Sequence, residues 1–115
     1  MVSDEVFRVT NKWGGAIVLT QKDWDRIKEK RPGVDGYAEH VRKTLEDPNM
    51  VFEGRHEDSK VFYGKGLLDD DRDYTACYVA VIVRYPPDGA PGTIRTVYFP
   101  FHVQAALGNC LHASR

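Results

Sequence analysis

His56 and Arg55 are the residues of this sequence best suited to acid–base chemistry on a phosphate. Tyr63 and Lys65 follow a few positions later, and we expect the two segments to face each other across a β-hairpin. Histidine is the natural general acid or base near neutral pH. The planar arginine fork can stabilise a phosphorane-like charge. A histidine beside a hairpin turn is also often simply solvated, so composition alone leaves both roles open.

A second candidate is a run of basic side chains that ends just before Pro32. The run comprises Arg26, Lys28, Lys30 and Arg31. These cations could bind a phosphate. The same residues would also be typical of a solvated helix face whose positive charges stabilise the helix C-terminus.

Arg95, Thr96, Tyr98 and His102 form a third group of polar residues near the end of the chain. Strand alternation places Thr96 and Tyr98 on one face of a strand and Arg95 on the other. We therefore expect these side chains to share one pocket only if a β-bulge or the end of the strand redirects them.

The acidic run 69–73 is the only part of the sequence that suggests a metal. A calcium loop of the EF-hand type would need Gly at its sixth position and Glu at its twelfth. Counted from Asp69, those positions hold Tyr74 and Ala80, so the pattern fails. The spacing of the four His and two Cys residues matches no zinc pattern. We expect no metal and no cofactor.

The elements that must position these residues follow from hydrophobic period and turn signals. Thr20 is a predicted N-cap for a helix that ends by Arg31, and a second helix is predicted over 36–46. The period then changes to that of strands, and 74–85 reads as the central strand because it is long, apolar and β-branched. The other predicted elements are a short hairpin of 6–10 with 16–20, strands at 50–56, 60–68 and 93–101, and a short final helix within 103–112.

This order predicts an α+β fold. We expect two N-terminal helices packed on an antiparallel, hairpin-linked β-sheet of about four to five strands, in a single domain over 1–115.

Composition restricts the function that such a domain could have. The chain has 115 residues, of which 42% are hydrophobic and 29% charged, the balance of an ordinary globular protein. Its formal net charge is -1, so any site for nucleic acid must be a local one. No apolar run is long enough to span a membrane. The N-terminus lacks a secretory signal, and two widely separated cysteines suggest no oxidising compartment, so we expect a cytoplasmic protein.

Several segments occur together in a familiar order: VLTQKDWDRIKEKRP, YAEHVRKTLEDPNMV, VFYGKG, YVAVIVRY and TIRTVYF. In this order they resemble the phage-associated branch of the barnase–EndoU–colicin–RelE nuclease superfamily. The resemblance covers roughly residues 17–102 and depends on the order and spacing of the segments rather than on one sharp motif.

The resemblance implies a metal-independent ribonuclease that cleaves RNA through a 2′,3′-cyclic phosphate, with its active site on the sheet. Many members act as toxins, so the implied partners are RNA and an immunity or antitoxin protein. The implied catalytic residues are His56, Arg31, Thr96 and Tyr63. The implied substrate-binding residues are Arg55, Lys30, Lys65 and Tyr98.

The chain departs from the family pattern at three places. Arg31 stands where the family usually has a His before the helix-ending Pro, Arg26 stands where a second His is common, and Val97 replaces an Ala. If the missing His is essential, this chain either uses His56 or is inactive. The alternative function is therefore a non-catalytic, protein-binding module of phage or mobile-element origin on the same fold.

Overall fold

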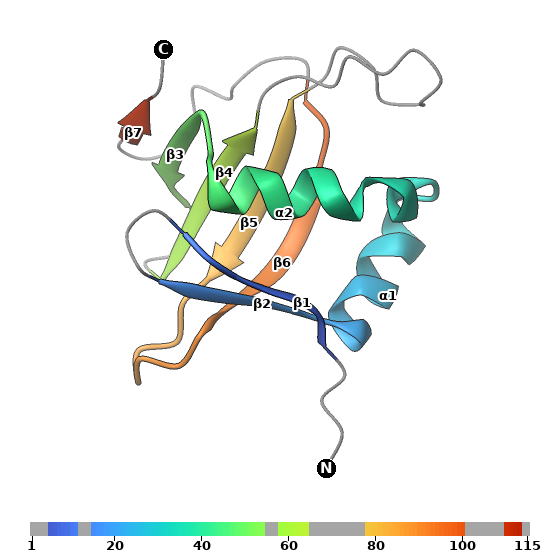
Figure 1. Cartoon of the computed structure of the whole chain (residues 1–115), viewed down its shortest axis with the longest axis horizontal. Coiled ribbons are helices and arrows are strands. Elements are labelled where there is room, and N and C mark those ends of the chain that lie inside the picture. Colours follow the sequence, from blue (N-terminus) through green and yellow to red (C-terminus); the bar gives the residue numbers. More distant parts are fainter. Residues whose placement is uncertain (1–4, 12–14, 55–57, 65–77, 101–109, 114–115) are drawn as a thin grey trace.

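The computed structural model describes residues 5–11, 15–54, 58–64, 78–100 and 110–113. Its helices and strands follow one another in the order shown in Figure 1. They are β1 (Glu5–Thr10), β2 (Ala16–Thr20), α1 (Gln21–Lys30), the 3-10 helix η1 (Val34–Tyr37), α2 (Ala38–Glu46), β3 (Met50–Glu53), β4 (Ser59–Gly64), β5 (Val79–Arg84), β6 (Gly92–Tyr98) and β7 (Cys110–Ala113).

Helix α1 begins and ends where the sequence predicts. The Thr20 hydroxyl oxygen accepts a 3.2 Å hydrogen bond from the backbone N–H of Asp23, which satisfies one of the free donors at the helix start. At the other end, the backbone N–H of Arg31 donates to the carbonyl of Ile27 at 3.0 Å, and Pro32 prevents a further turn. The helix therefore ends with Lys30 and Arg31 beside the sheet.

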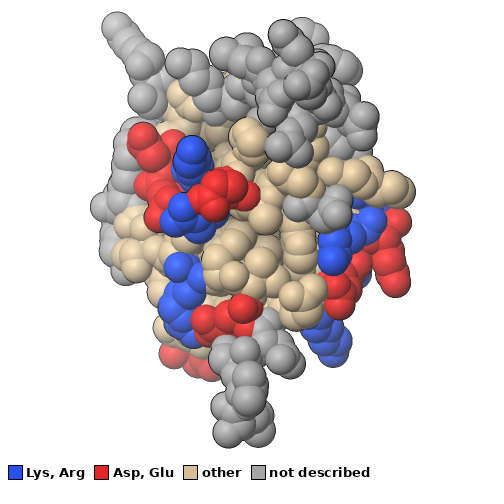
Figure 2. Space-filling view, turned by 45° about the vertical axis from the view of Figure 1, so that its right-hand side comes forward, with Lys and Arg blue, Asp and Glu red and all other residues tan. Residues whose placement is uncertain are grey.

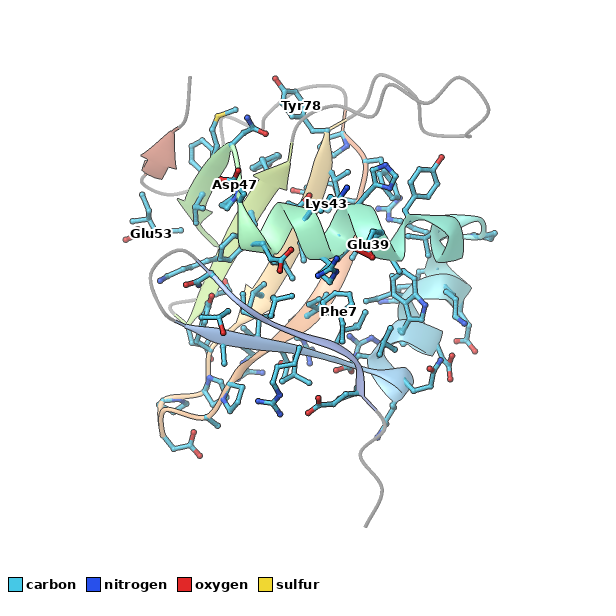
Figure 3. The ribbon with its side chains drawn as sticks, viewed as in Figure 1. Phe7, Glu39, Lys43, Asp47, Glu53 and Tyr78 are labelled. Atoms are coloured by element: carbon cyan, nitrogen blue, oxygen red, sulfur yellow. The ribbon has the colours of Figure 1, made fainter. Side chains whose placement is uncertain are left out.

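Helix α2 lies across one face of the sheet, which we call the α2 face (Figure 1). Val41 and Leu45 are fully buried beneath it. Exposed Glu39, Lys43 and Asp47 follow one another along its opposite side (Figure 3). The predicted helix over 36–46 is thus confirmed, except that its first residues belong to η1.

The sheet has seven strands in the order β1-β2-β6-β5-β4-β3-β7. Strands β3 to β6 form an antiparallel meander, and β5 is the central strand of the sheet, as predicted. The predicted hairpin of 6–10 with 16–20 is confirmed as β1 and β2. The expected count of four to five strands is too low, and the sheet is not purely antiparallel, because β2 pairs with β6 in parallel. Strand β1 also packs against α2, so the sheet curls around that helix.

The C-terminal prediction requires another correction. Residues 101–109 lie outside the described part of the chain, but 110–113 form strand β7 rather than the end of a helix. Strand β7 pairs antiparallel with β3, whose other edge is taken by β4. The unpaired edge of a strand such as β3 offers free backbone donors and acceptors. Hydrogen bonding of β7 to this edge outweighs the local preference of its residues for a helix.

Hydrophobic side chains are buried on both faces of the sheet. Val79, Val81 and Val83 of β5 point into the main core on the α2 face. Ala80 lies on the opposite face, in a smaller cluster with Val61 and Tyr63. This alternation confirms that β5 is apolar on both sides. Among the residues that the structure describes, no helix has the length and hydropathy needed to cross a membrane.

Candidate functional site

A small cavity lies where the end of α1 meets β6. It has a volume of about 200 Å³, and we call it the Arg31 cavity. Its lining consists of Ile27, Lys30, Arg31, Arg95, Thr96 and Val97. A site of about 10–15 Å³ already holds one water molecule, so the Arg31 cavity has room for a group as large as a phosphodiester.

A β-bulge in β6 explains why Arg95 and Thr96 line the same cavity. Val83 of β5 is opposite Ile94 and Ile82 is opposite Thr96, so Arg95 has no partner in β5. The extra residue interrupts strict alternation, and neighbouring side chains can then reach one site. Strand β6 therefore contains the kind of bulge that allows Arg95 and Thr96 to share a pocket.

The basic run of α1 divides into two pairs with different surroundings. Arg26 lies 3.2 Å from the Asp23 carboxylate, and Lys28 lies 3.4 Å from that of Asp25. Lys30 and Arg31 instead line the Arg31 cavity. Within the described part of the chain, no carboxylate forms an ion pair with Lys30, Arg31 or Arg95. The polar lining of this cavity thus consists of three cations and a hydroxyl group.

Arg31, Tyr98 and Tyr63 form a line of contacts that leads from the cavity into the sheet. The Arg31 guanidinium carbon lies 5.9 Å from the centre of the Tyr98 ring, within the range of a cation–π contact. The hydroxyl oxygens of Tyr98 and Tyr63 are 3.3 Å apart. Tyr63 is fully buried, and its hydroxyl reaches this site through Tyr98.

Neighbouring rings hold Tyr63 in place on the face opposite α2. Phe52 and Tyr78 both meet the Tyr63 ring edge-on, with centroids 5.7 and 6.2 Å away. Tyr78 directly precedes β5, at the top of the sheet in Figure 3. Edge-to-face contacts of this kind favour one ring orientation. The Tyr63 hydroxyl is thereby aimed at Tyr98.

A second cavity of about 410 Å³, the Arg84 cavity, continues from the first. It shares Arg95 and Thr96 with the Arg31 cavity and adds residues from β4 and β5. The additional residues are Asp58, Ser59, Ile82 and Arg84. The Arg84 guanidinium donates to the Asp58 carboxylate at 2.8 Å, so this end is closer to electrical neutrality. Positive charge is thus concentrated at the α1 end of the continuous site.

The structure brings five of the eight predicted site residues into one region: Lys30, Arg31, Tyr63, Thr96 and Tyr98. The other three, His56, Arg55 and Lys65, lie outside the described residues. His102 and the acidic run 69–73 lie outside them as well. Arg95 was not among the predicted site residues, because strand alternation places it on the face opposite Thr96. Arg84 was not predicted either, since no signal in the sequence marks it.

Figure 2 shows how charge is distributed on the face that carries α1. Basic and acidic side chains lie side by side there, around an uncharged centre. The described residues of this face therefore form no broad basic surface of the kind that tracks a long nucleic-acid backbone. Among the described residues, the Arg31 cavity provides a local concentration of positive charge that could bind an anion.

The described residues also contain no cluster of three or more His, Cys, Asp or Glu side chains that could hold a metal ion. Fold and cavities together define an α+β protein with a cationic cavity at the junction of a helix and a curled sheet. No protein-family model, curated protein or solved structure matches the chain.

Proposed function

We propose that this chain is a small metal-independent ribonuclease whose Arg31 cavity holds the phosphodiester that is cleaved. The observation that carries the proposal is the convergence of Lys30, Arg31 and Arg95 on one phosphate-sized cavity beside the Thr96 hydroxyl. Arginine binds phosphate through paired hydrogen bonds, and lysine adds a point charge. Cytoplasmic RNA is the proposed substrate.

In the proposed reaction, a base removes the proton of a ribose 2′-hydroxyl, and the 2′-oxygen attacks the neighbouring phosphorus. The bond from phosphorus to the 5′-oxygen then breaks, an acid protonates that oxygen, and a 2′,3′-cyclic phosphate remains. We assign the acid or base role to His56, which stands two residues before Asp58 in the sequence. Asp58 lines the Arg84 cavity, next to the phosphate position. Arg31 and Arg95 would stabilise the charge of the phosphorane.

Thr96 and the two tyrosines have positioning roles in this proposal. The Thr96 hydroxyl donates to the Arg95 carbonyl at 2.8 Å, so its oxygen is available to accept a hydrogen bond from the ribose. Tyr98 fixes the Arg31 guanidinium, and buried Tyr63 fixes Tyr98. Arg55 and Lys65 remain proposed contacts to the substrate.

The net charge of -1 favours a second candidate. A protein that engages long RNA usually carries a basic surplus, because phosphate contacts supply much of the affinity. The second candidate is a non-catalytic module that binds a protein partner, of phage or mobile-element origin. For the ribonuclease, an immunity or antitoxin protein is the proposed partner.

A cleavage assay separates the two candidates. Purified protein is incubated at low salt with a panel of end-labelled RNAs, with and without EDTA. We expect products that end in a 2′,3′-cyclic phosphate, with no effect of EDTA. Arg31→Ala should lower the rate, whereas Lys28→Ala should not, because Lys28 pairs with Asp25 outside the cavity. Intact RNA with folded protein, across the pH range in which histidine titrates, would overturn the ribonuclease and leave the binding module.

A further inference from the structure

A third cavity, of about 330 Å³, opens on the α2 face of the sheet. We call it the Lys60 cavity, and it shares no lining residue with the Arg31 and Arg84 cavities. Its lining consists of Asn11, Gly15, Val51, Lys60, Phe62, Tyr85 and Leu111. These residues come from the β1–β2 hairpin, from β3, β4 and β7, and from just beyond the end of β5. The volume falls within the range of small-molecule sites, which starts at about 300 Å³.

The floor of the Lys60 cavity is apolar. Val51 of β3 and Phe62 of β4 are opposite each other in the sheet and are both buried. Leu111 of β7 also lines the cavity, and 46% of its surface is exposed. An apolar ligand in this cavity would remove Leu111 from water and so gain binding energy.

The other side of the cavity carries polar groups that contact one another. The Lys60 ammonium lies 5.1 Å from the centre of the Tyr85 ring. The Asn11 amide accepts from the backbone N–H of Gly15 at 2.9 Å and donates to the Tyr85 oxygen at 3.4 Å. Tyr85 thus acts as the acceptor toward Asn11, and its own O–H remains able to donate to a ligand.

Burial raises the pKa of Tyr85 to about 12, and the hydrogen bond from Asn11 offsets this only in part. Tyr85 is therefore a neutral hydrogen-bond donor at physiological pH. Lys60 forms no ion pair with any carboxylate of the described residues. The polar side thus presents one positive charge and one hydroxyl donor.

We propose that the Lys60 cavity binds a small monocarboxylate with an apolar body. Its carboxylate would accept hydrogen bonds from Lys60 and Tyr85, and its body would lie against Val51, Phe62 and Leu111. A single cation beside one neutral donor matches a carboxylate better than a phosphate dianion. The contrast with the three cations of the Arg31 cavity supports this assignment.

The test is a titration of the full-length, ¹⁵N-labelled chain, followed by NMR. The probes are phenylacetate, benzoate and hexanoate, with phenylacetamide as the uncharged analogue of the first. We expect saturable shifts of the Val51, Phe62 and Leu111 amides with at least one acid, and weaker binding of phenylacetamide. Absence of saturable shifts with all three acids at millimolar concentration overturns the proposal.

Variants identify the groups that hold the carboxylate. Lys60→Met should weaken binding about tenfold, the value of one charge-assisted hydrogen bond, and Tyr85→Phe should weaken it by a smaller factor. Lys22→Met, which removes an exposed lysine of α1, is the matched control and should leave affinity unchanged. Unchanged affinity in folded Lys60→Met also overturns the proposal. Neither binding measurement depends on whether the protein cleaves RNA.

Discussion

The guanidinium of Arg26 donates a 2.9 Å hydrogen bond to the backbone carbonyl of Arg95, the bulged residue of β6. The two residues lie 69 positions apart in the sequence. The bond connects α1 to the bulge, and these elements form the two walls of the Arg31 cavity. Arg26 therefore acts on the cavity without lining it.

Removal of this connection should destabilise the protein slightly and loosen the bulge. Arg26→Ala is expected to lower the free energy of unfolding by about 1 kcal/mol, the value of one partly exposed hydrogen bond. Urea unfolding measures the loss, and faster amide exchange at Arg95 reports the loosened bulge. Arg42→Ala is the control. Among the described residues, Arg42 pairs with Glu39 and Glu46 of its own helix and with no other carboxylate, so the variant should cost about 0.5 kcal/mol or less. Equal losses in the two variants would contradict this role of Arg26.

Arg31 should affect RNA turnover in a way that depends on its shape as well as its charge. Arg31→Ala is expected to reduce the rate and to lower the slope of log affinity against log salt by about one, because one phosphate contact is lost. Arg31→Lys should keep the salt slope but lose turnover, since an ammonium lacks the planar fork. Wild-type turnover in Arg31→Lys would show that the fork is irrelevant.

His56→Ala tests the acid–base assignment. We expect cleavage to fall by roughly 10²–10⁴-fold, the usual share of general acid–base catalysis. The pH dependence between about 5 and 8 should flatten in the variant, because the group that titrates there is gone. Wild-type activity in His56→Ala would refute the assignment while leaving the phosphate site intact.

Val81 tests the central position of β5. Its side chain is fully buried on the α2 face, opposite Phe62 in β4 and Val97 in β6. Val81→Asp would bury an uncompensated carboxylate and should cost several kcal/mol, enough to unfold a small domain. Val81→Thr keeps the shape and should cost less. Thermal unfolding of both variants provides the measurement, and a stable Val81→Asp protein would contradict the observed packing.

Tyr85 should make stability depend on alkaline pH. Its folded-state pKa of about 12 lies above the ordinary value of 10.0, so the folded protein holds the phenol proton more tightly than the unfolded chain does. Stability from this group is complete below pH 10 and is lost as the pH rises toward 12. Unfolding experiments across this range should show a smaller decline for Tyr85→Phe. A decline of the same size in both proteins would assign the effect to other groups.

Local signals predicted the helices and the meander well. Thr20 and Pro32 delimit α1 through a cap and a blocked turn, and both act within a few residues. The β-branched run in 74–85 predicted a central strand because it lacks polar residues at alternate positions. A strand that is buried on both faces has this continuous apolar pattern. Helix boundaries and strand burial of this kind can be predicted from the spacing of hydrophobic and capping residues along the sequence.

Other features depend on contacts between distant segments and could not be predicted in the same way. The parallel pairing of β2 with β6 and the addition of β7 to β3 are choices of partner, which no local pattern encodes. The bulge at Arg95 shifts a register that alternation assumes to be regular. For this reason Arg95 lines the site, although regular alternation alone places it on the other face of the strand.

The pairing of β2 with β6 also has a consequence for the order of folding. Ile17 and Gly92 are partners across this junction, although most of the chain separates them. Local hairpins form quickly, whereas a contact of such long range must first overcome the entropy of closing the intervening loop. We therefore expect the β3–β6 meander to collapse first and the β1–β2 hairpin to dock late. During synthesis the β1–β2 hairpin emerges first, and the edge of β2 stays unpaired until β6 has been made. The nascent chain is most prone to incorrect strand pairing in this interval.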